Sequence, residues 1–294
     1  MTETKTKRDV YEIVTARIID QLEKGNVPWK QPWTNAGLPQ NLISRKSYRG
    51  INLLLLASLH YSQNFFLTLK QVQELGGKVK KGEKACPIVF WNWKEDENIE
   101  EKKKIPILRY YSVFNVEQCE DIPADKIPVD NLDRPNNPIQ ACFDIVDNMP
   151  KKPAIKHKEN RAYYYPFFDF INMPKMERFT DSESYYDTLF HELVHSTGHV
   201  TRLDRKEVVQ MKSLGGEAYS IEELTAEVGA CYLASVGGIV DVHFDNNVAY
   251  IQGWLEKLKS DKRFIIYACA KAQKAVDFIL NVPQAESDEE KNAE

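Results

Sequence analysis

Three histidines and a glutamate stand within nine positions in the stretch HELVHSTGH, residues 191–199. A helix has about 3.6 residues per turn, so His191 and His195 would lie on one face and their imidazoles could converge on one ion. Glu192 would project beside that ion, where a carboxylate can act as a general base on water. This H-E-x-x-H spacing predicts a Zn²⁺ site with a catalytic glutamate, in which Mn²⁺ or Co²⁺ could replace zinc.

The residues around this motif favour a buried helix. Thr180 and Glu183 fit a T-x-x-E capping box at its start, and Gly198 fits the glycine that often follows a helix end. An apolar stripe lies on the side away from the histidines and consists of Tyr186, Leu189, Phe190, Leu193 and Val194. The motif is therefore expected on a helix whose other side packs into a core.

A catalytic zinc site needs a third protein ligand if one position is to stay open for water. One pattern continues as H-x-x-G-x-x-H, but Thr201 occupies the position of its last histidine. His199 follows Gly198 directly, which leaves no chain to turn back towards the ion. We therefore expect His199 to be a hydrogen-bonded or surface residue rather than a ligand.

The segment YSIEELTAEVGACYLASVGG (219–238) predicts a second buried helix that can supply the missing ligand. Ser220 and Glu223 fit a capping box. Glu223 and Glu227 share a narrow face of small residues, whereas Glu222 points to the far side. Because two buried carboxylates are costly unless paired or metal-bound, we expect Glu223 to be the third ligand and Glu227 to accept a hydrogen bond from a ligand imidazole. The reverse assignment stays open, as does a surface capping glutamate beside an unrelated salt bridge.

Residues 29–49 interleave aromatic and cationic side chains. Single-stranded nucleic acid is bound by aromatic faces that stack on bases and by cations that neutralise phosphates. Residues 1–80 also carry 12 Lys and Arg against 6 Asp and Glu. The candidate DNA-binding residues are Trp29, Lys30, Trp33, Arg45, Lys46, Tyr48 and Arg49. The alternative is that the tryptophans belong to the core and that the basic RKSYR segment is only a solvated loop.

The sequence divides into two folded parts of an α+β protein. Residues 1–125 contain a helical segment and two strand-like runs, PIVFWNWK and ILRYYSVFNV, joined by a charged hairpin-like stretch. A segment rich in Pro, Asp and Asn predicts a linker over 126–140. Residues 141–282 hold both predicted metal-site helices, and the acidic residues 283–294 predict a disordered tail.

Several broad classes of protein are disfavoured by the global composition. No apolar run approaches the roughly 20 residues of a membrane span, so we expect no membrane contact. The polar start MTETKTKRDV does not resemble a signal peptide. The five cysteines show no C-x-x-C spacing, and their odd number fits reduced thiols in the cytoplasm.

HELVHSTGHVTRLDR, followed by YSIEELTAEVGACYL, resembles the metallopeptidase half of ArdC-type antirestriction proteins. The resemblance extends through AYYYPFFDFINMPKMERF (162–179) and AYIQGWLEKLKSD (249–261), and it includes GNVPWKQPW, ACPIVFWNWK and YYSVFNVEQCE in the first half. It implies an amino-terminal domain that binds single-stranded DNA, joined to a zincin-like metallopeptidase domain with an H-E-x-x-H helix. It also implies that the protein is encoded on a mobile element and shields incoming DNA from restriction.

By analogy with zincin-like folds, YYYPFFDFINM (163–173) is expected to form a strand along the cleft that can pair with an extended peptide. Its aromatic side chains could equally be core residues, which we favour for Phe168 and Phe170.

Two functions compete. In one, a zinc metallopeptidase tethered to a DNA-binding domain cuts a protein or peptide substrate that it meets on single-stranded DNA. In the other, the protein coats DNA without catalysis, and its metal site is structural or vestigial. An intact Glu192 favours the first function, because a structural site has no need of a general base.

Overall fold

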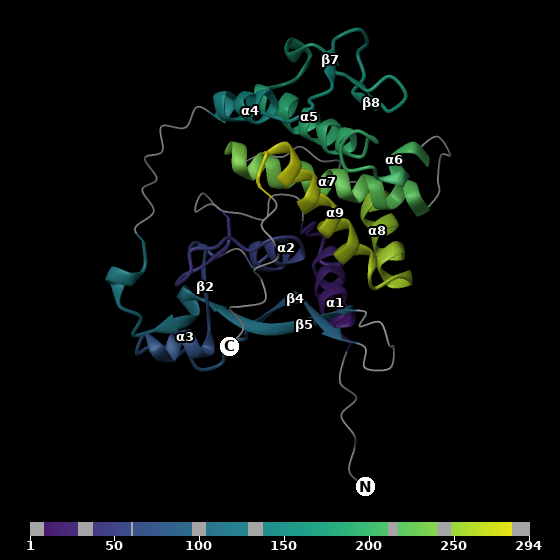
Figure 1. Ribbon diagram of the computed structural model, residues 1–294. Coiled ribbons are helices and arrows are strands. Elements are labelled where there is room, and N and C mark those ends of the chain that lie inside the picture. The colour runs from purple at the N-terminus through teal and green to yellow at the C-terminus, as the bar shows by residue number, and fades with distance from the viewer. Residues whose placement is uncertain are drawn as a thin grey trace.

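Helices and sheets occur in both halves of the chain, as expected for an α+β protein (Figure 1). The computed structural model describes residues 9–28, 38–59, 61–95, 104–128, 138–210, 217–239 and 248–283. Among these residues, no helix combines the length and the apolar character needed to cross a membrane.

The first half is built on a four-stranded sheet with the strand order β1-β2-β5-β4. Its strands are β1 (Gln40–Asn41), β2 (Phe65–Thr68), β4 (Cys86–Glu95) and β5 (Lys104–Asn115). The two long strands pair antiparallel, with Phe90 opposite Arg109, which confirms both strand predictions. The remaining elements are α1 (Val10–Glu23), α2 (Ile51–Ala57), α3 (Leu69–Glu74), β3 (Lys78–Val79), η1 (Val116–Gln118), β6 (Cys119–Glu120) and η2 (Ala124–Lys126).

The second half combines packed helices with a small sheet. The helices are α4 (Pro138–Asp147), α5 (Ser182–Thr197), α6 (Lys206–Gln210), α7 (Glu217–Gly237), α8 (Val248–Ser260) and α9 (Phe264–Ile279), with a short η3 (Met176–Arg178). Helix α7 packs against both α5 and α9. The sheet has the order β7-β9-β8 and consists of β7 (Ala154–Lys156), β8 (Tyr163–Tyr165) and β9 (Phe170–Asn172). The expected single strand over 163–173 is therefore two antiparallel strands, because the chain turns between Tyr165 and Phe170.

One hydrophobic core runs through both halves. Helix α1 packs on α8, and α2 packs on α9 (Figure 1). Val14 and Leu54 in the first half belong to the same buried cluster as Leu233 and Ile266 in the second. The division into domains at 126–140 stays a prediction, since most of that segment lies outside the described residues. Residues 284–294 of the predicted tail also lie outside them.

The helix starts differ from the capping predictions. The N-cap of α5 is Asp181, whose carboxylate accepts a hydrogen bond from the Ser184 backbone N–H at 2.7 Å. Thr180 therefore lies outside the helix. The ionised carboxylate of Asp181 also interacts favourably with the positive end of the helix dipole. Ser220 is not a cap either, because α7 begins three residues earlier at Glu217. The predicted end of the first helix is confirmed, with Gly198 as the C-cap of α5, and Gly237 is the last residue of α7.

Candidate metal centre

Helices α5 and α7 bring two imidazoles and a carboxylate together. His191 and His195 lie one turn apart on α5, with their Nε2 atoms 3.1 Å from each other. Glu223 on α7 places one carboxylate oxygen 3.6 Å from His191 Nε2 and the other 3.6 Å from His195 Nε2. A tetrahedral ion with ligand distances of about 2.0–2.1 Å separates its ligand atoms by about 3.3 Å. The three side chains therefore fit one divalent cation, both in spacing and in donor type.

The charges around His191 also favour a cation. Burial by itself would lower the pKa of His191. The contact with the Glu223 carboxylate and the negative charges of Glu192, Glu223 and Glu227 outweigh burial and raise that pKa to about 9. Burial tends to raise the pKa of Glu223, but its contact with His191 and the charges of both histidines lower that pKa. Three carboxylates thus act on one small site, which is the electrostatic setting that a divalent ion needs.

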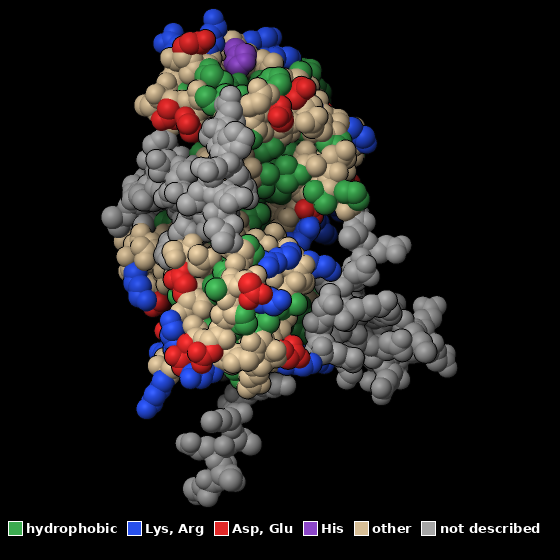
Figure 2. Space-filling view, turned by 90° about the vertical axis from the view of Figure 1, so that its left-hand side faces the viewer, with side chains coloured by type: hydrophobic (Ala, Val, Ile, Leu, Met, Phe, Trp, Pro, Cys, Tyr) green, Lys and Arg blue, Asp and Glu red, His purple; other side chains and the backbone are tan. Residues whose placement is uncertain are grey.

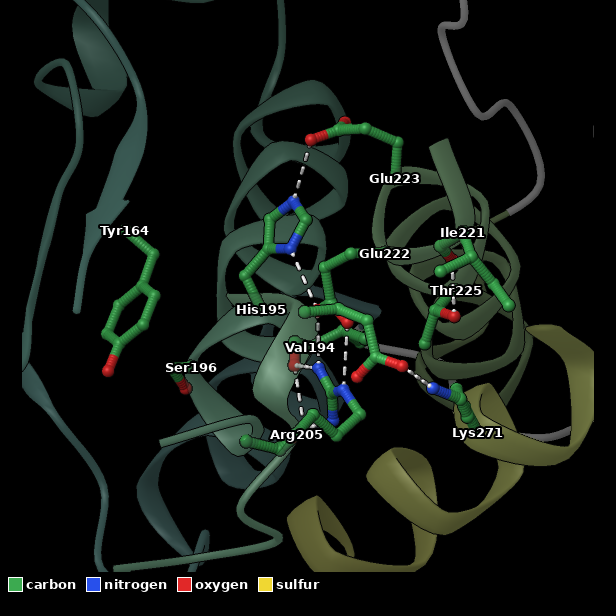
Figure 3. Close-up of polar contacts among 12 residues, drawn as sticks. Tyr164, Val194, His195, Ser196, Arg205, Ile221, Glu222, Glu223, Thr225 and Lys271 are labelled. Atoms are coloured by element: carbon green, nitrogen blue, oxygen red, sulfur yellow. Dashed lines mark hydrogen bonds and ion pairs between the residues drawn. The ribbon is translucent and has the colours of Figure 1, made fainter. Parts of the chain in front are cut away.

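The buried carboxylate of Glu222 orients His195 by contacting the Nδ1 side of its ring (Figure 3). The Nδ1 of His195 lies 3.2 Å from Oε1 of Glu222, whose side chain is fully buried. Arg205, just before α6, donates two hydrogen bonds to the Glu222 carboxylate at 3.0 and 2.6 Å. Burial raises the pKa of Glu222, but the hydrogen bonds from His195 and Arg205 and their positive charges lower it. An ionised Glu222 accepts the Nδ1–H of His195 and leaves its Nε2 facing His191 and Glu223.

Arg205 is itself held by α5. It donates to the hydroxyl oxygen of Thr197 at 2.6 Å and to the backbone carbonyl of Val194 at 2.8 Å. The guanidinium group therefore joins the last turn of α5 to Glu222 on α7.

This arrangement corrects the prediction for Glu222. We expected Glu222 to point away from the site, but its carboxylate is the partner of Nδ1 of His195. That Glu227 accepts a hydrogen bond from a ligand imidazole stays a prediction. Helix α7 is buried on nearly all sides, so its residue pattern does not mark which face meets α5. Glu227 is also buried, and its charge contributes to the raised pKa of His191.

The two remaining residues of the motif have different surroundings. Glu192 is buried next to His191, and its negative charge helps to raise the pKa of that imidazole. His199 lies apart from the three clustered side chains. Its Nδ1 is 2.8 Å from the Thr201 hydroxyl and 3.9 Å from a carboxylate oxygen of Asp169. His199 is thus a hydrogen-bonded residue, as expected.

The close approach of α5 and α7 depends on a glycine. A Cβ atom at Gly229 of α7 would lie 2.7 Å from one methyl group of Val194 on α5 and 3.0 Å from the other. Valine is stiff at χ1, so it has little freedom to move away. Gly229 therefore allows the helix spacing at which Glu223 reaches the two histidines.

Four of the seven predicted DNA-binding residues belong to the described part of the chain. Trp29, Lys30 and Trp33 lie outside the described residues. Tyr48 is half-buried and packs edge-on against Phe66, with ring centroids 6.2 Å apart, so it is a packing residue rather than a stacking platform. Tyr48 packs against the hydrophobic cluster that contains residues of α2 and Phe66 of β2.

The three basic candidates nearby differ in their surroundings. Arg45 is exposed, lies over the Phe65 ring at 5.2 Å and donates to the backbone carbonyl of Lys126. Arg49 forms an ion pair with Asp277 of α9, so it joins the two halves. Lys46 is exposed.

Exposed tyrosines on β5 were missed by the sequence reasoning. Tyr110 and Tyr111 are both exposed, and Arg109 next to them is exposed as well. The stretch RYYS within a predicted strand was the available signal, because one of two adjacent tyrosines in a strand must face away from the sheet's packed side.

Two family models match consecutive parts of the chain. Residues 8–114 match the N-terminal domain of anti-restriction factor ArdC, and residues 147–271 match a zincin-like metallopeptidase. The metal-free crystal structure of the antirestriction protein ArdC from plasmid R388 is 38% identical, with a TM-score of 0.73, and the match covers 92% of this chain and 97% of that one. The Mn(II)-bound structure of the same protein is 37% identical with a TM-score of 0.73, over 93% and 98% of the two chains.

Curated relatives include both longer and similar-sized proteins. An uncharacterised protein, y4eC of Sinorhizobium fredii, is 34% identical over 94% of this chain and 92% of its own length. Two proteins of Escherichia coli named DNA primase TraC are each 30% identical over almost the whole chain. The chain spans only 28% and 20% of the length of those two primases.

Proposed function

Because this chain belongs to the ArdC family of antirestriction proteins, we propose that it protects DNA by binding single strands and by acting as a metal-dependent peptidase on a protein met there. The observation that carries the catalytic part is the cluster of His191, His195 and Glu223, with Glu192 beside it. The matched zincin-like model and the Mn(II)-bound relative support a divalent ion at such a cluster.

The proposed ligands are His191, His195 and Glu223, and the proposed ion is Zn²⁺, with Mn²⁺ or Co²⁺ as substitutes. When bound, such an ion supplies a Lewis acid for a peptide carbonyl and lowers the pKa of water. Glu192 is the general base that takes a proton from water and passes it to the leaving amine. Glu222 keeps the Nδ1 of His195 occupied as a donor, so that its Nε2 stays directed to the ion.

For DNA binding, we propose the amino-terminal half as the primary surface. The exposed cations Arg45, Lys46 and Arg109 and the exposed rings of Tyr110 and Tyr111 support this proposal. Cations neutralise phosphates, and exposed aromatic faces accept unpaired bases of any sequence. Trp29, Lys30 and Trp33 remain predictions for the same surface.

A metal titration on the full-length chain tests the ligand assignment. Calorimetry with Zn²⁺ and with Mn²⁺ should show one ion per chain. His191→Ala or Glu223→Ala should weaken binding steeply, and His199→Ala is the matched control that should leave it unchanged. Loss of the ion in His199→Ala with retention in Glu223→Ala would show that the ligand set is wrong.

Catalysis is tested separately from metal binding. Glu192→Gln should bind the ion nearly as well as the parent chain but lose all cleavage of a protein substrate. If Glu192→Gln protects DNA from restriction as well as the parent chain does, protection is steric and the peptidase part of the proposal fails.

DNA binding is tested by fluorescence anisotropy with labelled single and double strands of the same sequence. We expect tighter binding of the single strand, and affinity that falls with salt by roughly 0.7 log units per phosphate contact for each decade of salt. Arg109→Glu should lower both affinity and salt slope. Lys274→Glu makes the same charge change on an exposed residue of α9 and should have little effect. Equal binding of both strand forms, insensitive to Arg109→Glu, would contradict the proposal.

A further inference from the structure

The outer face of the small β7-β9-β8 sheet carries a stack of aromatic rings. Tyr165 of β8 lies opposite Phe170 of β9, and their rings are stacked at 5.6 Å with an interplanar angle of 18°. Phe168, in the turn between the strands, continues the stack on Tyr165 at 5.5 Å and again at 18°. Phe167 meets Phe168 edge-on. The expectation that Phe168 is a core residue is therefore wrong, since it is 67% exposed and Phe167 is 74% exposed.

These rings do not belong to the packed side of the sheet. Ile171 and Tyr164 are neighbours across the strands and point to the opposite face, towards α5. Ile171 is fully buried there, and the Tyr164 hydroxyl donates to Asp169 at 2.8 Å. Because side chains alternate along a strand, packing of this inner face requires Tyr165 and Phe170 to face outward. The exposed stack is thus a second, solvent-facing surface with a fully formed core beneath it.

The turn that carries the most exposed rings is held firmly. The side chain of Arg202 is only 1% exposed and forms an ion pair with Asp169, which directly follows Phe168. Arg202 also donates to the Ser196 carbonyl of α5 at 2.7 Å and to the Lys151 carbonyl at 3.0 Å. The aromatic turn is therefore tied to the end of the metal-site helix through Asp169 and Arg202.

Positive charge predominates in the segment that carries the stack. Residues 150–178, which contain the whole sheet, carry seven Lys and Arg against three Asp and Glu. One of those three acids, Asp169, is neutralised by Arg202. Lys156 places its ammonium group 4.1 Å from the centre of the Phe170 ring, and Lys158 and Arg161 are exposed. Lys and Arg side chains are visible around the top of the molecule, where this sheet lies (Figures 1 and 2).

We propose that this aromatic face is a second contact site for single-stranded DNA, located on the peptidase half of the chain. An unpaired base would stack on the exposed ring of Phe168 and extend the existing stack, while Lys158 and Arg161 would neutralise neighbouring phosphates. A projecting stack of flat rings with cations around it matches the flat bases and the negative backbone of one strand. Duplex DNA does not fit, because its bases are already stacked within the helix.

The inference rests on the proposed binding of single-stranded DNA and adds a length requirement to it. The small sheet that carries the aromatic face and the strands β4 and β5 lie at opposite ends of the molecule, with α5, α7 and α9 between them (Figure 1). A strand that contacts both surfaces must pass these helices. Loss of the aromatic face should therefore weaken the binding of long oligonucleotides and spare that of short ones.

The test uses the full-length chain and fluorescently labelled oligothymidylates of about 10 and about 40 nucleotides. Phe168→Ala should weaken binding of the long strand at least about fivefold, the effect of losing one stacked base at the lower end of its usual range. Phe168→Tyr keeps a ring and should retain the parent affinity. Phe143→Ala, which removes a 51% exposed phenylalanine from α4, is the matched control and should change nothing. Lys158→Glu should reduce both the affinity for the long strand and its salt slope.

Cross-linking gives a readout that does not depend on any variant. Oligonucleotides that contain 5-iododeoxyuridine are irradiated with the parent chain, and the attached peptides are identified by mass spectrometry. A cross-link within 162–174 supports the site. If the parent chain binds the long strand but Phe168→Ala binds equally well and all cross-links map to 8–114, this inference is overturned and the proposed function stands. If Phe168→Ala impairs only the cleavage of a protein, the rings bind a peptide instead of DNA. The inference is then also overturned, and the proposed function again stands. If the parent chain binds no single strand at all, the DNA part of the proposed function fails with it.

Discussion

The buried pair of Glu222 and Arg205 allows fold stability and metal affinity to be separated by mutation. Glu222→Leu removes the carboxylate but leaves the guanidinium of Arg205 buried without its partner. Breaking a buried ion pair on one side costs about 3–5 kcal/mol of unfolding free energy. The double substitution Arg205→Met with Glu222→Leu also removes the charge that was left behind. We therefore expect the double variant to be more stable than Glu222→Leu by at least about 1 kcal/mol.

Metal affinity should not recover in the same way. Both variants remove the acceptor of the His195 Nδ1–H, which lies 3.2 Å from Glu222. Loss of such a supporting hydrogen bond weakens metal binding by about 10–100-fold. Affinity is measured by calorimetric titration with Zn²⁺. Stability is measured by urea unfolding followed by circular dichroism with EDTA present, because a bound ion would add to stability by mass action.

A matched control lies close to this pair. Glu207 forms an ion pair with Lys271, but both side chains are partly exposed. Glu207→Leu should therefore cost at most about 1 kcal/mol and leave Zn²⁺ affinity unchanged. The reasoning is refuted if the double variant is no more stable than Glu222→Leu, or if it regains the metal affinity of the parent chain.

Identical substitutions of two helical glycines should have opposite signs in urea unfolding. Gly229→Ala should destabilise by about 1–3 kcal/mol because of its contact with Val194, whereas Gly253→Ala meets no atom within 4 Å and should stabilise by about 0.5–1 kcal/mol. An isolated fragment 1–125 should unfold at lower urea than the full chain and bind the dye ANS, since α8 and α9 cover its apolar surface. A fragment as stable as the full chain would show that the halves fold independently. EDTA should lower the thermal midpoint while leaving the far-ultraviolet circular dichroism unchanged, because the ligands lie on helices with their own core.

Properties that depend on neighbours along the chain could be predicted from the sequence. The one-turn spacing of His191 and His195 follows from helix geometry alone, and the structure places their Nε2 atoms 3.1 Å apart. The two long strands and the mixture of helices and sheets were also predicted, because alternation and apolar periodicity are local signals. Glu223 could be selected as a ligand candidate because a buried carboxylate requires a partner.

Properties that depend on how helices and sheets pack were decided only by the tertiary structure. A helix such as α7, buried on nearly every side, has no polar face that marks its orientation, so the contact between Glu222 and His195 could not be predicted. The partner that keeps Glu222 charged, Arg205, comes from outside both helices. The exposure of Phe168 could not be predicted either, because aromatic residues occur on both buried and exposed faces of strands. Which face of the small sheet is covered depends on where α5 packs. That contact is distant in the sequence, so the residues of the strands do not indicate it.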